Sequence, residues 1–197
     1  MAALVVLATP AFAQRQRLRV DSYVIDADIT PAQHRLAARA KVTVTALDSL
    51  NTLPFELHNG LRVTKVLDER GHPIAASSIE RVTQESSIRV NLPSGLAPNQ
   101  STTLTFDYEG ILNTADDSPV EGLKLAHVGD DETYLLYAGR WFPMVGYGTN
   151  RFTATMNITV PSGLTVIASG TSSAPKPAGP GKVTYTFTQN TPSFPGT

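Results

Sequence analysis

An alternation of apolar and polar residues, which recurs from residue 17 onward, is the feature that most limits the fold of this chain. It is clearest between Arg35 and Leu47, where one face carries Leu36, Ala38, Ala40, Val42, Val44 and Ala46. The opposite face carries Arg35, Arg39, Lys41, Thr43 and Thr45. A period of two predicts a half-buried strand with one face in water. Residues 33–41 are good helix formers, but the alternation runs on into β-branched residues, which favours a strand.

Further strands are predicted wherever short alternating segments lie between turn-forming residues. They cover residues 23–29, 53–57, 61–67, 81–83, 88–92, 104–108, 152–160, 164–168 and 183–187. Asn59-Gly60 is the strongest hairpin dipeptide and predicts that the strands on either side of it pair. Pro93-Ser94-Gly95 is predicted to break the chain, and no segment predicts a helix. Short strands with regular turn signals indicate an all-β fold of antiparallel sheets, either a β-sandwich or a pair of saddle-shaped sheets.

Length and composition set the class of protein. The chain has 197 residues, a formal net charge of -1 and no cysteine. This predicts one domain over residues 14–197, with a core that stands without disulfides or thiolate chemistry. The near-zero charge gives no electrostatic reason to expect nucleic acid or an anionic membrane as partner. No segment has the roughly 18 apolar residues of a membrane span.

The first 13 residues are predicted to be a signal peptide. Residues 4–8 form a short apolar core, Ala11-Phe12-Ala13 is an A-x-A cleavage pattern, and the chain then turns polar. This arrangement is typical of a secretory leader cut after Ala13. A basic n-region is missing, so the leader is expected to begin upstream, and the mature protein is expected to be periplasmic or extracellular.

Metal-binding and nucleophilic motifs are absent from the sequence. The four histidines (His34, His58, His72 and His127) do not have the spacing of a zinc site, and no G-x-S-x-G occurs. Residues 111–133 lack periodicity and are predicted to form a long loop. Its acidic residues, from Asp116 to Glu132, are of the type that calcium prefers, but no calcium-loop pattern exists. Solvated charge is therefore the favoured interpretation, and no catalytic residue or metal ligand is predicted.

The segment from Tyr134 to Tyr147 is unusual because it is rich in aromatic residues and interrupted by glycines and a proline. It holds the only tryptophan of the chain, Trp141. Trp141, Phe142, Met144 and Tyr147 are residue types enriched in interface cores. They fit a surface that contacts another molecule, and equally a plug that closes one end of the sandwich. The residue types do not decide between the two.

Several motifs in order resemble the N-terminal domain of M1-family zinc aminopeptidases (aminopeptidase N-like). They are Arg140-Trp141-Phe142-Pro143, Arg151-Phe152-Thr153-Ala154, Ile158-Thr159-Val160-Pro161-Ser162-Gly163, Ala168-Ser169-Gly170 and Phe187-Thr188-Gln189-Asn190-Thr191-Pro192. The early strands, to residue 67, are also similar, and the resemblance covers about residues 18–197. It implies a saddle-shaped β domain that packs against a thermolysin-like catalytic domain. The G-x-M-E-N and H-E-x-x-H motifs of that catalytic domain are absent from this sequence.

The resemblance implies roles for the aromatic segment. Tyr134 and Tyr137 are expected at the rim of the substrate pocket, and the domain-contact loop is expected to comprise Arg140, Trp141, Phe142, Pro143, Met144 and Tyr147. Tyr134 replaces a glutamine that lines the substrate pocket in many members, and the usual D-E-P after the Phe-Pro pair is absent. Substrate preference therefore does not carry over. Trp141 and Phe142 are expected to be exposed in the isolated chain.

The sequence thus predicts the non-catalytic N-terminal domain of an exported M1-like metallo-aminopeptidase. Such a domain would brace the catalytic domain and cap the substrate cavity. The chain is expected to hold no cofactor and to be inactive alone, whereas zinc would lie in the catalytic domain. That catalytic domain, in the same or a separate chain, is the expected partner, and peptide substrate would be contacted only indirectly. The alternative is a free-standing exported β-sandwich that binds or adheres through Tyr134–Tyr147.

Overall fold

A computed structural model describes residues 16–78, 88–113, 123–146 and 148–194. Nearly all of its regular structure is strand. The strands are β1 (Leu18–Thr30), β2 (Arg35–Ala46), β3 (Leu50–Phe55), β4 (Leu61–Leu67), β5 (Ala76–Ser78), β6 (Ile88–Leu96), β7 (Ser101–Ile111), β8 (Ala126–Val128), β9 (Thr133–Leu135), β10 (Phe152–Pro161), β11 (Thr171–Ser172), β12 (Lys176–Pro177) and β13 (Lys182–Ser193). Two 3-10 turns, η1 (Pro31–Gln33) and η2 (Tyr137–Gly139), complete the described elements. The predicted all-β class is confirmed.

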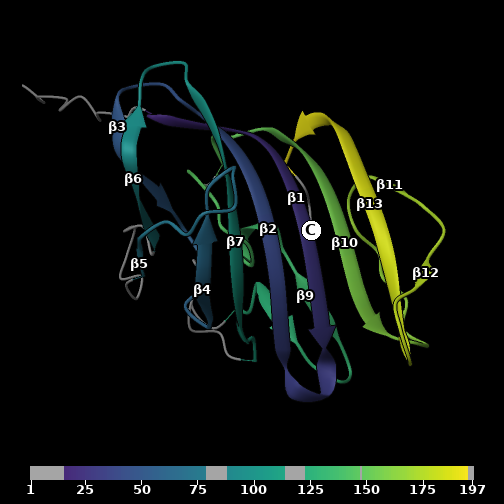
Figure 1. Cartoon of the computed structure of the whole chain (residues 1–197). Coiled ribbons are helices and arrows are strands. Elements are labelled where there is room, and N and C mark those ends of the chain that lie inside the picture. Colours follow the sequence, from purple (N-terminus) through teal and green to yellow (C-terminus); the bar gives the residue numbers. More distant parts are fainter. Residues whose placement is uncertain (1–15, 79–87, 114–122, 147, 195–197) are drawn as a thin grey trace, which may run out of the picture.

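One large sheet organises the fold. Its strand order is β11-β13-β10-β1-β2-β7-β4, and β12 also pairs with β13 (Figure 1). All neighbours in it are antiparallel except β1 and β10, which are parallel. The parallel pair brings Tyr23 opposite Ala154, so segments far apart in sequence lie side by side at the centre of the sheet.

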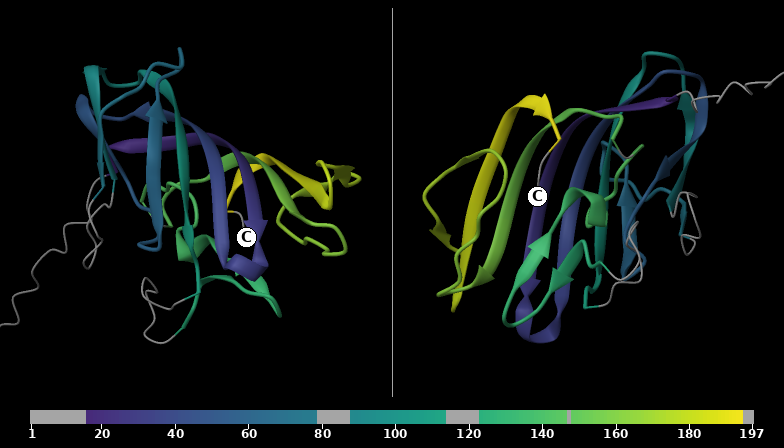
Figure 2. Two further views of the ribbon diagram at one scale, coloured as in Figure 1. Left: turned by 60° about the horizontal axis from the view of Figure 1, so that its bottom comes forward. Right: turned by 180° about the vertical axis from the view of Figure 1, so that it is seen from behind.

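Two smaller sheets complete the structure. Strands β3, β6 and β5 form one, and β8 and β9 form a hairpin. Seen from behind the large sheet, the β8–β9 hairpin lies over one of its faces, and the three-stranded sheet lies at its side (Figure 2). The apolar faces of β1, β2, β7 and β10 turn inward and supply most of the core: Tyr23, Ile25, Ala40, Val42, Leu104, Phe106, Met156 and Ile158 are all buried.

The other face of the large sheet carries a row of polar side chains across neighbouring strands. Thr186 Oγ1 donates to Asn157 Oδ1 (2.8 Å), and Asn157 Nδ2 donates to Asp26 Oδ1 (2.7 Å). Further along, Arg39 donates twice to Asp107, at 2.6 and 2.9 Å. Cross-strand pairs of this kind are the unit of sheet stabilisation, and they account for the alternation that predicted strands with one polar face.

The hairpin predicted at Asn59-Gly60 is wrong, although a turn does form there. The Leu61 N–H donates to the His58 carbonyl (2.9 Å), which closes a four-residue turn. However, β3 pairs with β6 and β4 pairs with β7, so the turn connects two different sheets. Neither Asn59 nor Gly60 has a positive φ, whereas a two-residue hairpin turn of the Asn-Gly type requires one.

Three other boundaries also differ from prediction. β6 continues through Pro93 and Gly95, with a register shift against β3 between residues 50 and 52. Residues 164–168 are not a strand. The long loop predicted at 111–133 contains β8 and leads into β9. Residues 114–122 of this loop, the predicted strand at 81–83 and the predicted leader at 1–13 lie outside the described ranges. Within the described ranges, no helix is long and apolar enough to cross a membrane.

Candidate functional site

The aromatic segment follows the β8–β9 hairpin and begins with a tight turn. The 3-10 turn η2 ends at Gly139 and is capped by Arg140, which takes a left-handed conformation (φ 52°) and donates its N–H to the Tyr137 carbonyl. Gly139 is required here because a Cβ atom at this position would lie 2.6 Å from the Leu125 carbonyl oxygen. The turn thus presses the segment against the residues just before β8.

A buried ion pair joins the segment to the end of β3. Arg140 Nε donates to Glu56 Oε2 at 2.7 Å, and both side chains are largely shielded from water. The backbone is joined as well: the His58 N–H donates to the Arg140 carbonyl, and Glu56 and Met144 exchange hydrogen bonds of 2.7 and 2.9 Å. The segment therefore acts as a short additional strand beside residues 56–58.

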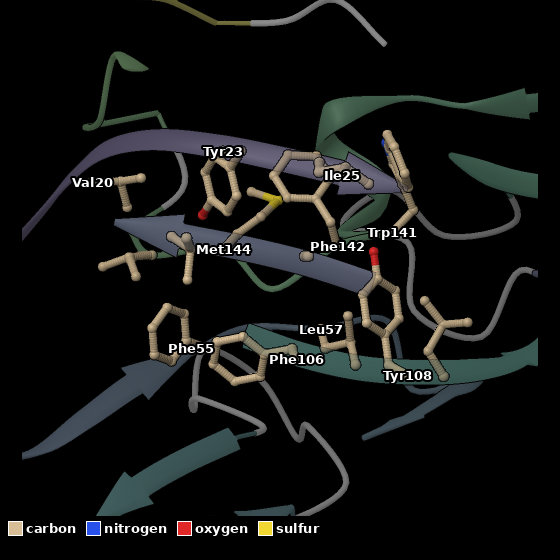
Figure 3. Close-up of a cluster of buried hydrophobic side chains, with 14 of the residues drawn as sticks. Val20, Tyr23, Ile25, Phe55, Leu57, Phe106, Tyr108, Trp141, Phe142 and Met144 are labelled. Carbon is tan, nitrogen blue, oxygen red and sulfur yellow. The ribbon is translucent and has the colours of Figure 1, made fainter. Parts of the chain in front are cut away.

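An aromatic cluster joins the segment to β1 and β10. The Tyr23 ring lies edge-on to Phe142 (5.0 Å between centroids) and to Phe152 (4.7 Å). Trp141 in turn packs edge-on against Phe142 at 4.9 Å. Figure 3 shows Phe142 and Met144 in one cluster with Tyr23 of β1 and Phe55 of β3. Edge-to-face pairs at these separations stabilise the cluster beyond the area that they bury.

The expectation that Trp141 and Phe142 are exposed is wrong. Their exposed fractions are 2% and 1%, and Pro143, Met144 and Arg140 are buried too. The physical reason is that both sides of the segment are occupied by this chain, with residues 56–58 on one side and β1 and β10 on the other. The aromatic platform on which the binding-module alternative depends is therefore not present at the surface.

Asn150 is a buried residue that sequence reasoning missed. Its Oδ1 accepts hydrogen bonds from the Val20 N–H (2.9 Å) and from Gln16 Nε2 (2.6 Å), and its Nδ2 donates to the Val145 carbonyl (2.7 Å). It thus fixes the end of the aromatic segment to the start of β1. An asparagine beside glycine and threonine resembles an ordinary turn residue, so the sequence offers no signal of this role.

The two tyrosines predicted at the rim of the substrate pocket have different environments. Tyr137 is buried, with its ring near Phe152 (6.1 Å) and Phe194 (5.8 Å). Tyr134 on β9 is half-buried, and its ring lies 5.6 Å from that of His127 on β8. Tyr147 lies outside the described residues. Of the two tyrosines, only Tyr134 has a substantial surface for contact with another molecule.

A pocket of about 320 Å³ lies beside Tyr134, between the β8–β9 hairpin and residues 164–168. Its apolar wall comes mainly from β1, β10 and the aromatic segment, through Ile29, Trp141, Met156, Ile158 and Val160. Asp130, Asp131 and Glu132 line it from the loop between β8 and β9. Its volume is within the range of small-molecule sites, roughly 300–1,000 Å³.

The residues that the structure describes do not fit a metal centre. No group of three or more histidine, aspartate or glutamate side chains among them is placed to hold a metal ion. His127 Nδ1 is buried without a hydrogen-bond partner, and burial of the ring lowers the pKa of His127. Lys124 lowers that pKa further, whereas Glu132 opposes the shift. These features favour the neutral form of a half-buried histidine over a metal ligand.

The family model and the solved structures that match this chain indicate the same family. A family model described as the peptidase M1 N-terminal domain matches residues 19–194. Among solved structures, an M1 zinc metallopeptidase from Deinococcus radiodurans is 23% identical, with a TM-score of 0.74, over 90% of this chain and 40% of that chain. A mutant of that enzyme bound to a Tyr-Ser-Ala substrate is 24% identical, with a TM-score of 0.74, over 93% and 41% of the two chains.

A third solved structure, a mutant two-domain M1 zinc metallopeptidase bound to L-tryptophan, is 23% identical, with a TM-score of 0.74, over 90% of this chain and 40% of that chain. At these identities the structural likeness establishes the fold alone. The chain spans about two fifths of the length of the structures that it matches. A search of curated proteins found no match.

Proposed function

Since the chain belongs to the peptidase M1 N-terminal domain family, we propose that it is the non-catalytic N-terminal domain of an exported M1-like zinc aminopeptidase. Its function is to brace the catalytic domain and to cap one side of the substrate cavity. The observation that carries this proposal is the family match, which covers residues 19–194 of the 197.

The architecture of the aromatic segment supports a bracing role. The Arg140–Glu56 pair, the Glu56–Met144 bridge and the Tyr23–Phe142 contact join β1, β3 and the β8–β9 side of the fold into one unit. A domain that holds another in place must resist deformation, and hydrogen-bonded contacts within a packed core provide that rigidity.

Tyr134 is the residue that we assign to the cap. It is half-buried on β9 and lines the pocket, so part of its surface is free to face a cavity formed with a second domain. Leu164 and Ile167, exposed by 41% and 89%, stand on the other side of the same pocket and extend the apolar surface. Exposed apolar residues that gather at one place are typical of a surface that meets a partner.

Export is part of the proposal and depends on the leader-like residues 1–13 alone. The expected partner domain carries zinc, and the mechanism that this metal supplies is activation of water for attack on the peptide carbonyl. The described residues of this chain offer no place for the metal, so no catalytic step is assigned to them.

The test uses the purified chain together with the DNA that follows its coding sequence. The chain is expected to release no product from amino-acid p-nitroanilides, with or without added zinc. The DNA downstream, or a neighbouring gene, is expected to encode both G-x-M-E-N and H-E-x-x-H. Turnover by the chain alone that a chelator abolishes would overturn the proposal, as would the absence of both motifs from that region.

A further inference from the structure

The pocket beside Tyr134 combines an apolar interior with a charged mouth. The interior is formed by side chains of β1 and β10 that are buried in the core, such as Ile29, Met156 and Ile158. On one side of the mouth stand Leu164 and Ile167, both exposed. Every lining residue named here belongs to this chain. The inference concerns the pocket as this chain alone forms it, whereas the proposed function assigns Leu164 and Ile167 at its mouth to a surface that meets a partner.

Three consecutive carboxylates occupy the other side of the mouth. Asp130, Asp131 and Glu132 all line the pocket, and all three are exposed, which places them where the pocket meets solvent. No ion pair involves them within the described part of the chain, and none of the described lining residues is basic. The mouth therefore carries negative charge that no ion pair among the described residues neutralises.

The wall of the pocket also contains a hydrogen-bond donor without a partner. Trp141 lines the pocket, is 2% exposed, and its indole N–H is unpaired among the described residues. Buried donors are nearly always paired, so an unpaired one is unusual and leaves room for an acceptor from outside the described residues. An acceptor atom on a bound molecule, or a water that enters with it, would satisfy this group.

From these three observations we infer that the pocket is a binding site for a small amphipathic amine. The apolar body of the ligand lies against Met156, Ile158 and Trp141, and its ammonium group lies at the mouth among the three carboxylates. Apolar burial supplies most of the affinity, since charge attraction at a solvent-exposed site is weak. The carboxylates supply the preference for a cation over a neutral or anionic ligand of the same length.

The test uses Trp141 as a built-in reporter, because it is the only tryptophan in the chain. Hexylamine, hexanol and hexanoate, which share one chain length and differ in charge, are titrated into the protein. Tryptophan fluorescence and the single indole N–H resonance in a ¹H–¹⁵N spectrum report binding. Hexylamine is expected to bind saturably and about tenfold more tightly than hexanol, a difference of about 1.4 kcal/mol. Hexanoate is expected not to saturate.

Two kinds of variant separate the charged mouth from the apolar interior. Neutralising the mouth with Asp130→Asn, Asp131→Asn and Glu132→Gln together is expected to make hexylamine bind no better than hexanol. The control Glu69→Gln removes an exposed carboxylate from the turn after β4 and is expected to leave the preference unchanged. Ala168→Phe is expected to fill the pocket and abolish binding of all three probes; Thr165→Phe, at an exposed lining position, replaces it if the first variant unfolds.

Several results would overturn the inference. They are the absence of saturable binding by hexylamine, equal binding of hexanoate, and a preference for the amine that survives neutralisation of the mouth. Sedimentation is measured in parallel, because a second copy of the chain could occupy the same pocket. Self-association that Ala168→Phe abolishes and hexylamine does not reverse would assign the pocket to that second copy instead.

Discussion

The hydroxyl of Tyr23 donates a buried hydrogen bond of 2.7 Å to the carbonyl oxygen of Pro143. This bond joins β1, at the centre of the large sheet, to the aromatic segment, and it lies within the cluster formed by Phe142 and Phe152. Burial raises the pKa of the Tyr23 phenol well above its ordinary value, which favours the protonated hydroxyl that donates this bond.

Tyr23→Phe is therefore expected to destabilise the protein by about 1–2 kcal/mol, because it leaves the buried Pro143 carbonyl without this donor. The change keeps the ring and its contacts, so the loss reports the hydrogen bond. The free energy of unfolding from urea denaturation, followed by tryptophan fluorescence, measures it.

Tyr108→Phe is the matched control with the opposite expectation. The Tyr108 hydroxyl is buried and has no hydrogen-bond partner among the described residues, and Figure 3 shows it pointing toward Trp141. Removing an unpaired buried hydroxyl relieves a desolvation penalty of about 1 kcal/mol or more. The variant is expected to be as stable as the original chain or more stable. Equal losses for the two variants would show that the Tyr23–Pro143 bond has no special role.

The Arg140–Glu56 ion pair provides a second test. The side chains of Arg140 and Glu56 are 10% and 18% exposed, so Arg140→Met leaves the Glu56 carboxylate buried without this partner. Removing one partner of a buried pair is strongly destabilising, here by about 3 kcal/mol. Urea denaturation gives the change in free energy of unfolding.

An ion pair on the polar face of the large sheet supplies the comparison for Arg140. Arg35 and Glu109 form it, and their side chains are 42% and 47% exposed. Because exposed pairs contribute less than about 1 kcal/mol, Arg35→Met is expected to have a much smaller effect than Arg140→Met. Similar losses at the two positions would contradict the view that burial of the Arg140–Glu56 pair matters.

Alternation in the sequence predicted the strands of the large sheet correctly because it records which face of each strand is buried. Leu36, Val42 and Val44 on β2, and Phe106 on β7, are buried as the pattern indicates. The family predicted from local motifs is confirmed by the match over residues 19–194. Both kinds of signal are local. The alternation within a strand indicates which of its faces is buried, and a motif indicates the family from a few neighbouring residues.

The pairing of strands and the burial of the aromatic segment could not be predicted, because both depend on distant parts of the chain. Asn59-Gly60 indicates a turn but not which strands lie beyond it, and β3 and β4 enter different sheets. Residues 164–168 alternate, yet β10 already has neighbours on both sides, and the outer side of β13 pairs with β11 and β12. Trp141 was expected at the surface because the resemblance implies that it contacts a second domain. The residue type alone does not show whether the residues that bury a tryptophan belong to the same chain.

His127 gives the chain an expected sensitivity to acid. Burial lowers the pKa of His127 in the folded state, Lys124 and His34 lower it further, and Glu132 opposes them. The unfolded chain therefore takes up a proton on His127 near pH 6.5, before the folded chain does. Stability consequently falls as the pH decreases below about 7. His127→Gln is expected to flatten this decline in urea midpoints measured from about pH 7.5 to 5.5; an unchanged slope would contradict this assignment.

Gly110 on β7 lies close to the turn that precedes β4. A Cβ atom at this position would lie 1.9 Å from the Gly60 carbonyl oxygen and 2.9 Å from the Leu61 Cα, all backbone atoms that cannot rotate away. Gly110→Ala is therefore expected to destabilise the fold by about 3 kcal/mol, the upper end of the overpacking range. Gly71→Ala is the control: its Cβ would meet nothing within 4 Å, and only its positive φ of 84° opposes the change. Its cost is about 1 kcal/mol. Thermal and urea denaturation of the two variants side by side measure the difference, and a Gly110→Ala variant as stable as Gly71→Ala would show that β7 and the turn are not held this close.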